Sequence, residues 1–166
     1  STLSKEYNDL HNSVQEAQPF TGTTIERYPN GRVKEEIPYR NGVRVGTYRL
    51  WYPNGQLEER SEYQNDGSMA KTEAWYENGS RAGLGFCRGS LQVGEITEWH
   101  PNGQLKCKTW TDDEGNITKQ VHCYPSGQKR CVRIWKDSGW TYLEEWDENG
   151  NPMTRTEEQR EALDPE

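Results

Sequence analysis

Six glycines at an almost constant interval restrict the fold of this chain more than any other feature. The interval is 24 residues between Gly31, Gly55, Gly79, Gly103 and Gly127, and 23 residues from there to Gly150. Each of these glycines directly follows Asn or Ser. A strict interval across most of a chain indicates a tandem array in which every unit has one structural job. The repeat is therefore predicted to be the fold.

A second set of turn signals lies between these glycines, at residues 40–42, 65–67, 87–89, 113–115 and 137–139. Asn-Gly and Asp-Gly supply the positive φ angles that tight hairpin turns require. Each unit is therefore predicted to hold two strands and two turns. The six turns at the regular glycines and the five turns between them make eleven. They would join about twelve short strands in one elongated, up-and-down antiparallel meander.

The composition favours a sheet that is only one layer thick. Only 30% of the residues are hydrophobic, and the mean hydropathy is -1.19. A two-layer sandwich needs more Val, Ile and Leu. However, seven Trp and nine Tyr at regular places are too many for a disordered chain. Amphipathic aromatic side chains that cover a single all-β layer reconcile these two observations.

Alternation along the strands predicts two different faces. Tyr48 and Leu50 point one way, and Arg49 and Trp51 point the other way. Because strands lie about 4.8 Å apart, units repeat every ~10 Å, which predicts a row of tryptophans along the sheet. The row consists of Trp51, Trp75 and Trp99. Two interpretations stay open, namely packing between units and an exposed binding surface.

The two ends of the chain depart from the repeat. Residues 1–18 are polar and form a predicted N-terminal cap or lead, whereas residues 154–166 form an acidic C-terminal tail of helix-forming composition. The repeat sheet is predicted to cover residues 19–153. Terminal segments folded over the open edges would protect the sheet from pairing with other chains.

The charge and the motifs argue against several classes of function. A formal net charge of -7 disfavours nucleic acid and anionic membrane surfaces, and fits a basic protein partner better. The three histidines have no metal-ligand spacing, and no phosphate-binding loop motif is present. His100 takes the place that a tyrosine holds in neighbouring units, which predicts a structural role. We therefore predict no catalytic residues, no metal and no cofactor.

The four cysteines lack paired C-x-x-C spacing, which argues against a structural zinc site. Cys107 and Cys123 each lie eight residues from Gly115. If the turn is symmetric about Gly115, they are near neighbours on adjacent strands. They would then either form a disulfide or remain two reduced thiols in the sheet.

Several motifs together resemble a known family. The chain has PFTG at residues 19–22, repeated Y-P-N-G-x-[LV] units, and Gly22, Gly46 and Gly94 nine residues before a turn glycine. These features resemble the bacterial MORN-type repeats of the YwqK-type antitoxin family, over roughly residues 19–153. The resemblance implies an elongated antiparallel meander and an antitoxin or immunity role.

The resemblance leads to the hypothesis that this monomer binds a secreted bacterial toxin, such as a secretion-system effector, and neutralises it sterically. The expected anchors are Trp51, Trp75 and Trp99, with Glu73 and Glu95 meeting Lys or Arg of the toxin. Alternatives are a scaffold or adhesion module and a lipid-binding protein. We expect a periplasmic or cell-envelope location, with any membrane contact through a removed N-terminal anchor; the alternative location is the cytoplasm.

Overall fold

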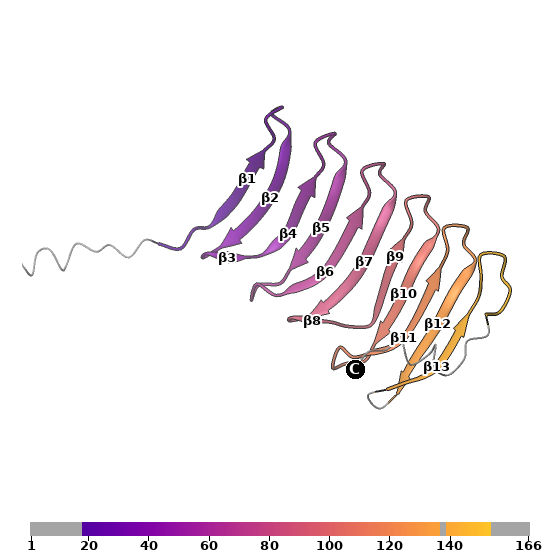
Figure 1. Ribbon diagram of the computed structural model, residues 1–166. Helices are drawn as coiled ribbons and strands as arrows, with labels where there is room; N and C mark the ends of the chain where they lie inside the picture. Colours follow the sequence, from indigo (N-terminus) through magenta and orange to yellow (C-terminus); the bar gives the residue numbers. More distant parts are fainter. Residues whose placement is uncertain (1–17, 137–138, 154–166) are drawn as a thin grey trace, which may run out of the picture.

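The computed structural model describes residues 18–136 and 139–153 as one open, curved antiparallel sheet (Figure 1). No helix is present among these residues. The predicted all-β meander of tandem hairpin repeats is therefore confirmed. Most of the N-terminal lead, residues 137–138 of one predicted turn, and the C-terminal tail lie outside the described residues.

Thirteen strands form the sheet, and eleven of them follow one another in the order β1-β2-β4-β5-β6-β7-β9-β10-β11-β12-β13. The strands are β1 (Gly22–Arg27), β2 (Val33–Arg40), β3 (Val43–Arg44), β4 (Gly46–Trp51), β5 (Leu57–Tyr63), β6 (Met69–Trp75), β7 (Arg81–Arg88), β8 (Leu91–Gln92), β9 (Glu95–Trp99), β10 (Leu105–Thr111), β11 (Ile117–Cys123), β12 (Lys129–Lys136) and β13 (Gly139–Glu145).

The turn between β4 and β5 shows why the repeat needs Asn-Gly. Gly55 has a φ of 93°, and its N–H donates to Tyr52 O at 2.8 Å. Tyr52 N–H in turn donates to Gln56 O at 2.9 Å, and Gln56 N–H donates to the Asn54 side-chain oxygen at 2.8 Å. Asn54 thus closes the turn through its side chain, while glycine accepts the positive φ without steric cost.

Two of the mid-unit turns differ from the prediction. After β2 and after β7 the chain makes a small side hairpin, in which β3 pairs with β2 and β8 pairs with β7. The chain then re-enters the sheet through glycines with positive φ, 75° at Gly46 and 77° at Gly94. Over the described residues, the main path has eleven strands instead of about twelve, because up to residue 153 only an isolated bridge between Trp146 and Pro152 follows β13.

The sheet opens between β2 and β4. These strands pair only at Glu35–Leu50 and Glu36–Arg49, and beyond that point Pro38 has no N–H to donate to a neighbouring strand. Val45 N–H donates to Pro38 O at 3.0 Å in place of a ladder bond. An open hollow of about 860 Å³ lies at this opening, beside side chains of the mid-unit turns.

The core is small, as expected for a single layer. The buried apolar side chains are Ile37, Val45, Tyr48, Cys107, Cys123 and Cys131. Ser61 is fully buried, and its hydroxyl donates to Thr72 Oγ1 at 2.9 Å or to Glu59 Oε1 at 2.7 Å. Cohesion therefore depends on the hydrogen-bond ladder and on contacts between neighbouring units more than on a thick apolar interior.

Cross-strand register assigns the side chains to two faces. Residues paired across neighbouring strands share a face, as in the row Arg49, Arg60, Glu73, Leu84, Thr97 and Lys108. We call this face, which also carries Trp51, Trp75 and Trp99, the tryptophan face. The opposite face carries the row Ile37, Tyr48, Ser61, Thr72 and Gly85, and we call it the tyrosine face.

Candidate functional site

Trp51, Trp75 and Trp99 occupy equivalent places at the ends of β4, β6 and β9. The backbone carbonyl of each accepts a hydrogen bond from the tyrosine hydroxyl of the preceding unit. The bonds run from Tyr28 to Trp51 at 2.6 Å, from Tyr52 to Trp75 at 3.0 Å and from Tyr76 to Trp99 at 2.7 Å. The tryptophan backbone therefore joins consecutive units, and the half-buried side chains remain on the tryptophan face.

The same position continues this series along the sheet. His100 Nε2 lies 3.0 Å from Cys123 O, and the Tyr124 hydroxyl donates to Trp146 O at 3.0 Å. His100 thus contacts a backbone carbonyl of the next unit as the tyrosines do, in agreement with its predicted structural role. We call this series of contacts the tyrosine clamp; it consists of Tyr28, Tyr52, Tyr76, His100 and Tyr124 and their carbonyl acceptors.

Turn asparagines make a second connection between units. Each donates its side-chain N–H to a carbonyl of the next turn, at 2.7–3.2 Å. The donors are Asn30, Asn54, Asn78 and Asn102. Ser126 breaks this series, because serine has no second polar group to reach forward. The Asn-Gly turns are therefore hairpin turns that also bind one another, turn to turn, along the strand ends on one side of the sheet.

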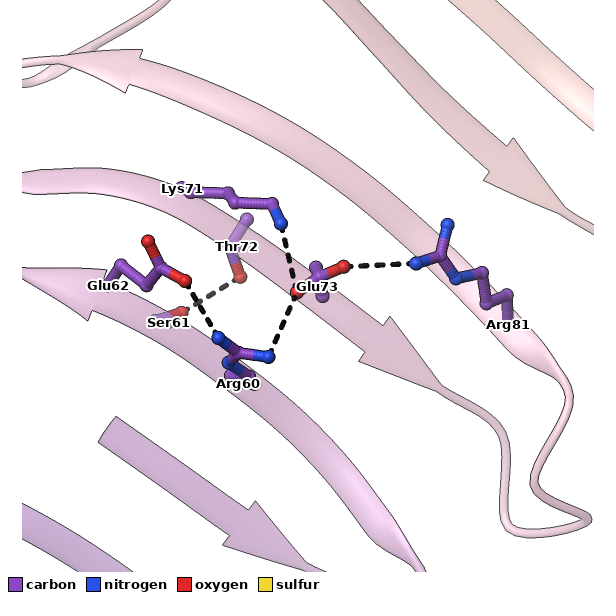
Figure 2. Close-up of polar contacts among 7 residues, drawn as sticks. All are labelled: Arg60, Ser61, Glu62, Lys71, Thr72, Glu73 and Arg81. Carbon is purple, nitrogen blue, oxygen red and sulfur yellow. Dashed lines mark hydrogen bonds and ion pairs between the residues drawn. The ribbon is translucent and has the colours of Figure 1, made fainter. Parts of the chain in front are cut away.

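Glu73 lies at the centre of a cluster of cations on the tryptophan face (Figure 2). Its carboxylate lies 3.1 Å from Lys71 Nζ, 3.1 Å from Arg81 Nη2 and 3.9 Å from Arg60 Nη1. The Glu73 side chain is only 9% exposed, whereas the three cations are 29–51% exposed. The neighbouring Glu62 also pairs with Arg60, at 3.0 Å.

This geometry corrects the role that we expected for Glu73. Glu73 does lie on the same face as Trp75, as alternation predicts. However, cations of this chain already surround its buried carboxylate, so Glu73 is not placed to meet a Lys or Arg of a partner. The cluster also reaches the tryptophan row, because the Arg81 guanidinium lies 5.8 Å from the centre of the Trp99 ring. Glu73 therefore positions Arg81 beside Trp99.

Glu95 lies on the same face and is more accessible, with 48% of its side chain exposed. Its carboxylate pairs with Lys108 at 2.8 Å. Trp110, which the sequence argument did not single out, lies beside this pair. Lys108 Nζ and Lys119 Nζ lie 5.4 Å and 5.1 Å from its ring centre, within cation–π range. The face thus alternates aromatic rings with ion pairs.

The symmetric pairing predicted for Cys107 and Cys123 is wrong, because Cys107 lies opposite His122. Asp112 N–H donates to Asn116 O, so the turn is centred on Glu114 instead of Gly115. Pairing centred on Glu114 is offset by two residues from the predicted pairing. The bulge between Trp110 and Thr111 removes one residue of this offset, and the remaining one places His122 opposite Cys107. All four cysteines are free thiols in the structure.

Burial gives the thiols of this region little reactivity. It raises the pKa of Cys107, Cys123 and Cys131 above the ordinary value for a thiol. Burial, together with Arg133, lowers the pKa of His122, whose Nε2 lies 3.7 Å from Cys107 Sγ. Among residues 18–136 and 139–153, no group of three or more His, Cys, Asp or Glu could hold a metal ion. Cys107, His122 and Cys131 therefore form a neutral, packed row on the tyrosine face, whereas Cys123 follows His122 and lies on the other face.

Three further residues of the site were not predicted from the sequence, namely Arg60, Lys71 and Arg81. A signal for two of them was present, since residues that flank the turn at Gly67 nearly symmetrically must pair. Arg60 and Glu73 do pair in this way across β5 and β6. Lys71 lies two residues before Glu73 and therefore shares its face. Arg81 could not be found in this way, because a register shift precedes its pairing with Trp75.

Comparisons with known proteins agree with this architecture. Residues 20–41, 44–65 and 92–109 match the MORN repeat variant. The strands, the turns and these three matches together define a repeat-built β-meander. The chain therefore contains MORN-type repeats.

Other comparisons add little detail. No curated protein matches the sequence. One similar solved structure is the crystal structure of accessory secretory protein 1,2 and 3 in Streptococcus pneumoniae, with 14% sequence identity and a TM-score of 0.37. That match covers 76% of this chain and 23% of the other chain. No helix in the described part of this chain is long and apolar enough to cross a membrane.

Proposed function

We propose that this protein is a non-enzymatic binding protein that neutralises a secreted bacterial toxin by covering it, in the manner of an antitoxin or immunity protein. The observation that carries the proposal is the tryptophan face, where half-buried aromatic rings alternate with charged side chains on a pre-formed sheet. Aromatic and Arg side chains are the usual anchors of protein interfaces. The resemblance to the YwqK-type antitoxin family is the reason for proposing a toxin as the partner.

The way the face is held supports tight binding. The tyrosine clamp fixes the backbone that carries each tryptophan, and the ion pair with Glu73 orders the Arg81 side chain. Side chains that are already ordered lose less entropy when a partner binds. An ordinary interface of about 800 Å² per partner then suffices for a stable complex. No bond needs to be made or broken, because occlusion of the toxin is enough.

Co-expression with candidate secreted toxins from neighbouring genes tests the proposal. Trp75→Ala and Trp99→Ala should reduce protection, since an anchor tryptophan contributes about 2 kcal/mol or more, which is roughly a 30-fold change in affinity. Trp135→Ala is the matched control. Ile134 pairs with Lys119 of the tryptophan face, so the next residue of β12, Trp135, lies on the opposite face. Circular dichroism should be unchanged in all three variants.

The outcome separates this proposal from its alternatives. If both variants on the tryptophan face protect as well as the unsubstituted protein, this face does not bind the toxin. If the unsubstituted protein gives no protection either, the scaffold or adhesion alternative is favoured. Glu73 is left out of this test because its replacement is expected to lower stability.

A further inference from the structure

The centre of the tryptophan face presents cations to solvent although the whole chain is acidic. Within the cluster around Glu73, the buried group is the carboxylate and the accessible groups are the three cations. Arg60 is 42% exposed, Lys71 is 29% exposed and Arg81 is 51% exposed. A molecule that approaches this face therefore meets positive side chains first.

The register adds a fourth cation to the patch. Arg49 of β4 lies directly opposite Arg60 of β5, and like charges in directly opposed positions destabilise a sheet. Glu36 pairs with Arg49 at 3.7 Å. We call Arg49, Arg60, Lys71 and Arg81 the cationic patch. With Glu36, Glu62 and Glu73 among them, the local balance is four positive against three negative charges, in a chain of formal net charge -7.

Apolar side chains frame the cationic patch. Phe86 lies opposite Lys71 in the register and is 41% exposed. Leu84 lies opposite Glu73, and Trp99 lies beside Arg81. Cations with exposed aromatic side chains beside them suit a peptide that carries carboxylates next to apolar residues.

We infer that the partner of this protein presents an acidic segment to the cationic patch, with its carboxylates between Arg60, Lys71 and Arg81. This inference rests on the proposed function and specifies the chemistry of the partner. It reverses the sign that the sequence indicated, where Glu73 was to meet a basic residue. The reversal follows from depth, since alternation places Glu73 on the correct face but its carboxylate lies below its cations.

A peptide titration of the full-length protein tests the sign of the partner without any toxin. The probes are a soluble Glu-rich peptide with one Phe and the same peptide with each Glu replaced by Lys. Two-dimensional NMR reports on the Arg side chains and on the Trp indole N–H groups. The Glu-rich peptide should shift the signals of Arg60, Arg81 and Trp99, and the shifts should weaken at high salt, which screens accessible charges.

Charge removal identifies the site. Lys71→Gln and Arg81→Gln should each weaken binding of the Glu-rich peptide by about two- to fivefold, as the loss of one accessible ion pair does. Lys119→Gln is the matched control, because Lys119 is a lysine of the same face that lies beside Trp110, away from the cationic patch. It should leave the affinity unchanged. Circular dichroism and thermal melting check that each variant is folded.

Three results would overturn the inference. The first is that the Lys-rich peptide shifts the same signals, and the second is that Lys71→Gln and Arg81→Gln bind the Glu-rich peptide normally. The third is that single-stranded DNA or anionic vesicles bind the patch more tightly than the Glu-rich peptide, which would assign it to another class of anion. None of these results depends on protection against a toxin, so failure here is distinguishable from failure of the proposed function.

Discussion

Replacement of Glu73 by Gln should destabilise the sheet more than any other single loss of charge on the tryptophan face. Glu73→Gln keeps the shape of the side chain but leaves Arg60, Lys71 and Arg81 without their shared carboxylate. Breaking a fully buried ion pair costs about 3–5 kcal/mol, whereas an exposed pair contributes only about 0.2–1 kcal/mol. The Glu73 side chain is 9% exposed but its cations are 29–51% exposed. We therefore expect a loss of about 2 kcal/mol, between these two limits.

Thermal melting followed by circular dichroism measures this loss. In a chain of this size, about 2 kcal/mol corresponds to a decrease in Tm of about 4–8 °C. The control is Glu98→Gln, since Glu98 is 47% exposed and has one partner, Lys106 at 2.9 Å. The control should lower Tm by less than about 4 °C. Equal decreases for both variants would refute the argument that depth and number of cations make Glu73 different.

Three further predictions concern the units of the repeat and the thiols. Tyr52→Phe removes the 3.0 Å bond to Trp75 O and should lower Tm by about 2–4 °C, as the loss of about 1 kcal/mol does. Ser126→Asn should raise the melting temperature, because it restores the forward side-chain N–H that Asn102 supplies in the preceding unit. In the folded protein, a thiol reagent should modify Cys87 first and the three buried cysteines only after unfolding; four equally fast thiols would contradict the burial that the structure shows.

Tyr48 gives a prediction about alkaline pH. Burial, and then the hydrogen bond to Glu35 at 3.1 Å, raise the pKa of Tyr48 above its ordinary value. The folded state thus favours the neutral phenol. The resulting stability is fully present below the ordinary tyrosine pKa of about 10 and is lost as the pH rises through the folded pKa. A phenolate absorbance titration checks this: near pH 11, Tyr48→Phe should lose no absorbance relative to the unsubstituted folded protein.

The turn glycines made the fold predictable, because positive φ at a constant interval leaves few alternatives to a hairpin meander. The side hairpins at β3 and β8 were not predicted, since residues 40–42 look like an ordinary turn. A signal was present in Gly46 and Gly94, each preceded by Val. Both glycines have positive φ at the point where the chain re-enters the sheet. The sequence gives the positions of these glycines, but it does not show that the chain leaves the sheet before them and re-enters it there.

The candidate site was less predictable, because alternation gives the side of a residue but not its depth. Glu73 and Trp75 were placed on the correct face, while the burial of Glu73 depends on the cations that three strands contribute. The cysteine pairing failed for a related reason. A shift of one residue in the register moves a side chain to the other face, and only the closed turn from Asp112 to Asn116 fixes that register.

The distribution of constant and variable residues among the units separates the parts that fold this chain from the parts that can recognise a partner. The clamp tyrosines, turn asparagines and glycines recur every 24 residues, and the contacts between units use those side chains and backbone carbonyls. In contrast, the equivalent central positions of the tryptophan face are Arg49, Glu73, Thr97 and Val121, and on the returning strands Glu36, Arg60, Leu84, Lys108 and Val132. Neither the tyrosine clamp nor the turn asparagines use these positions, although Glu73 stabilises its own part of the sheet through its three cations. They can therefore change in charge and size without loss of the fold, and they are where a repeat sheet can encode the chemistry of its partner.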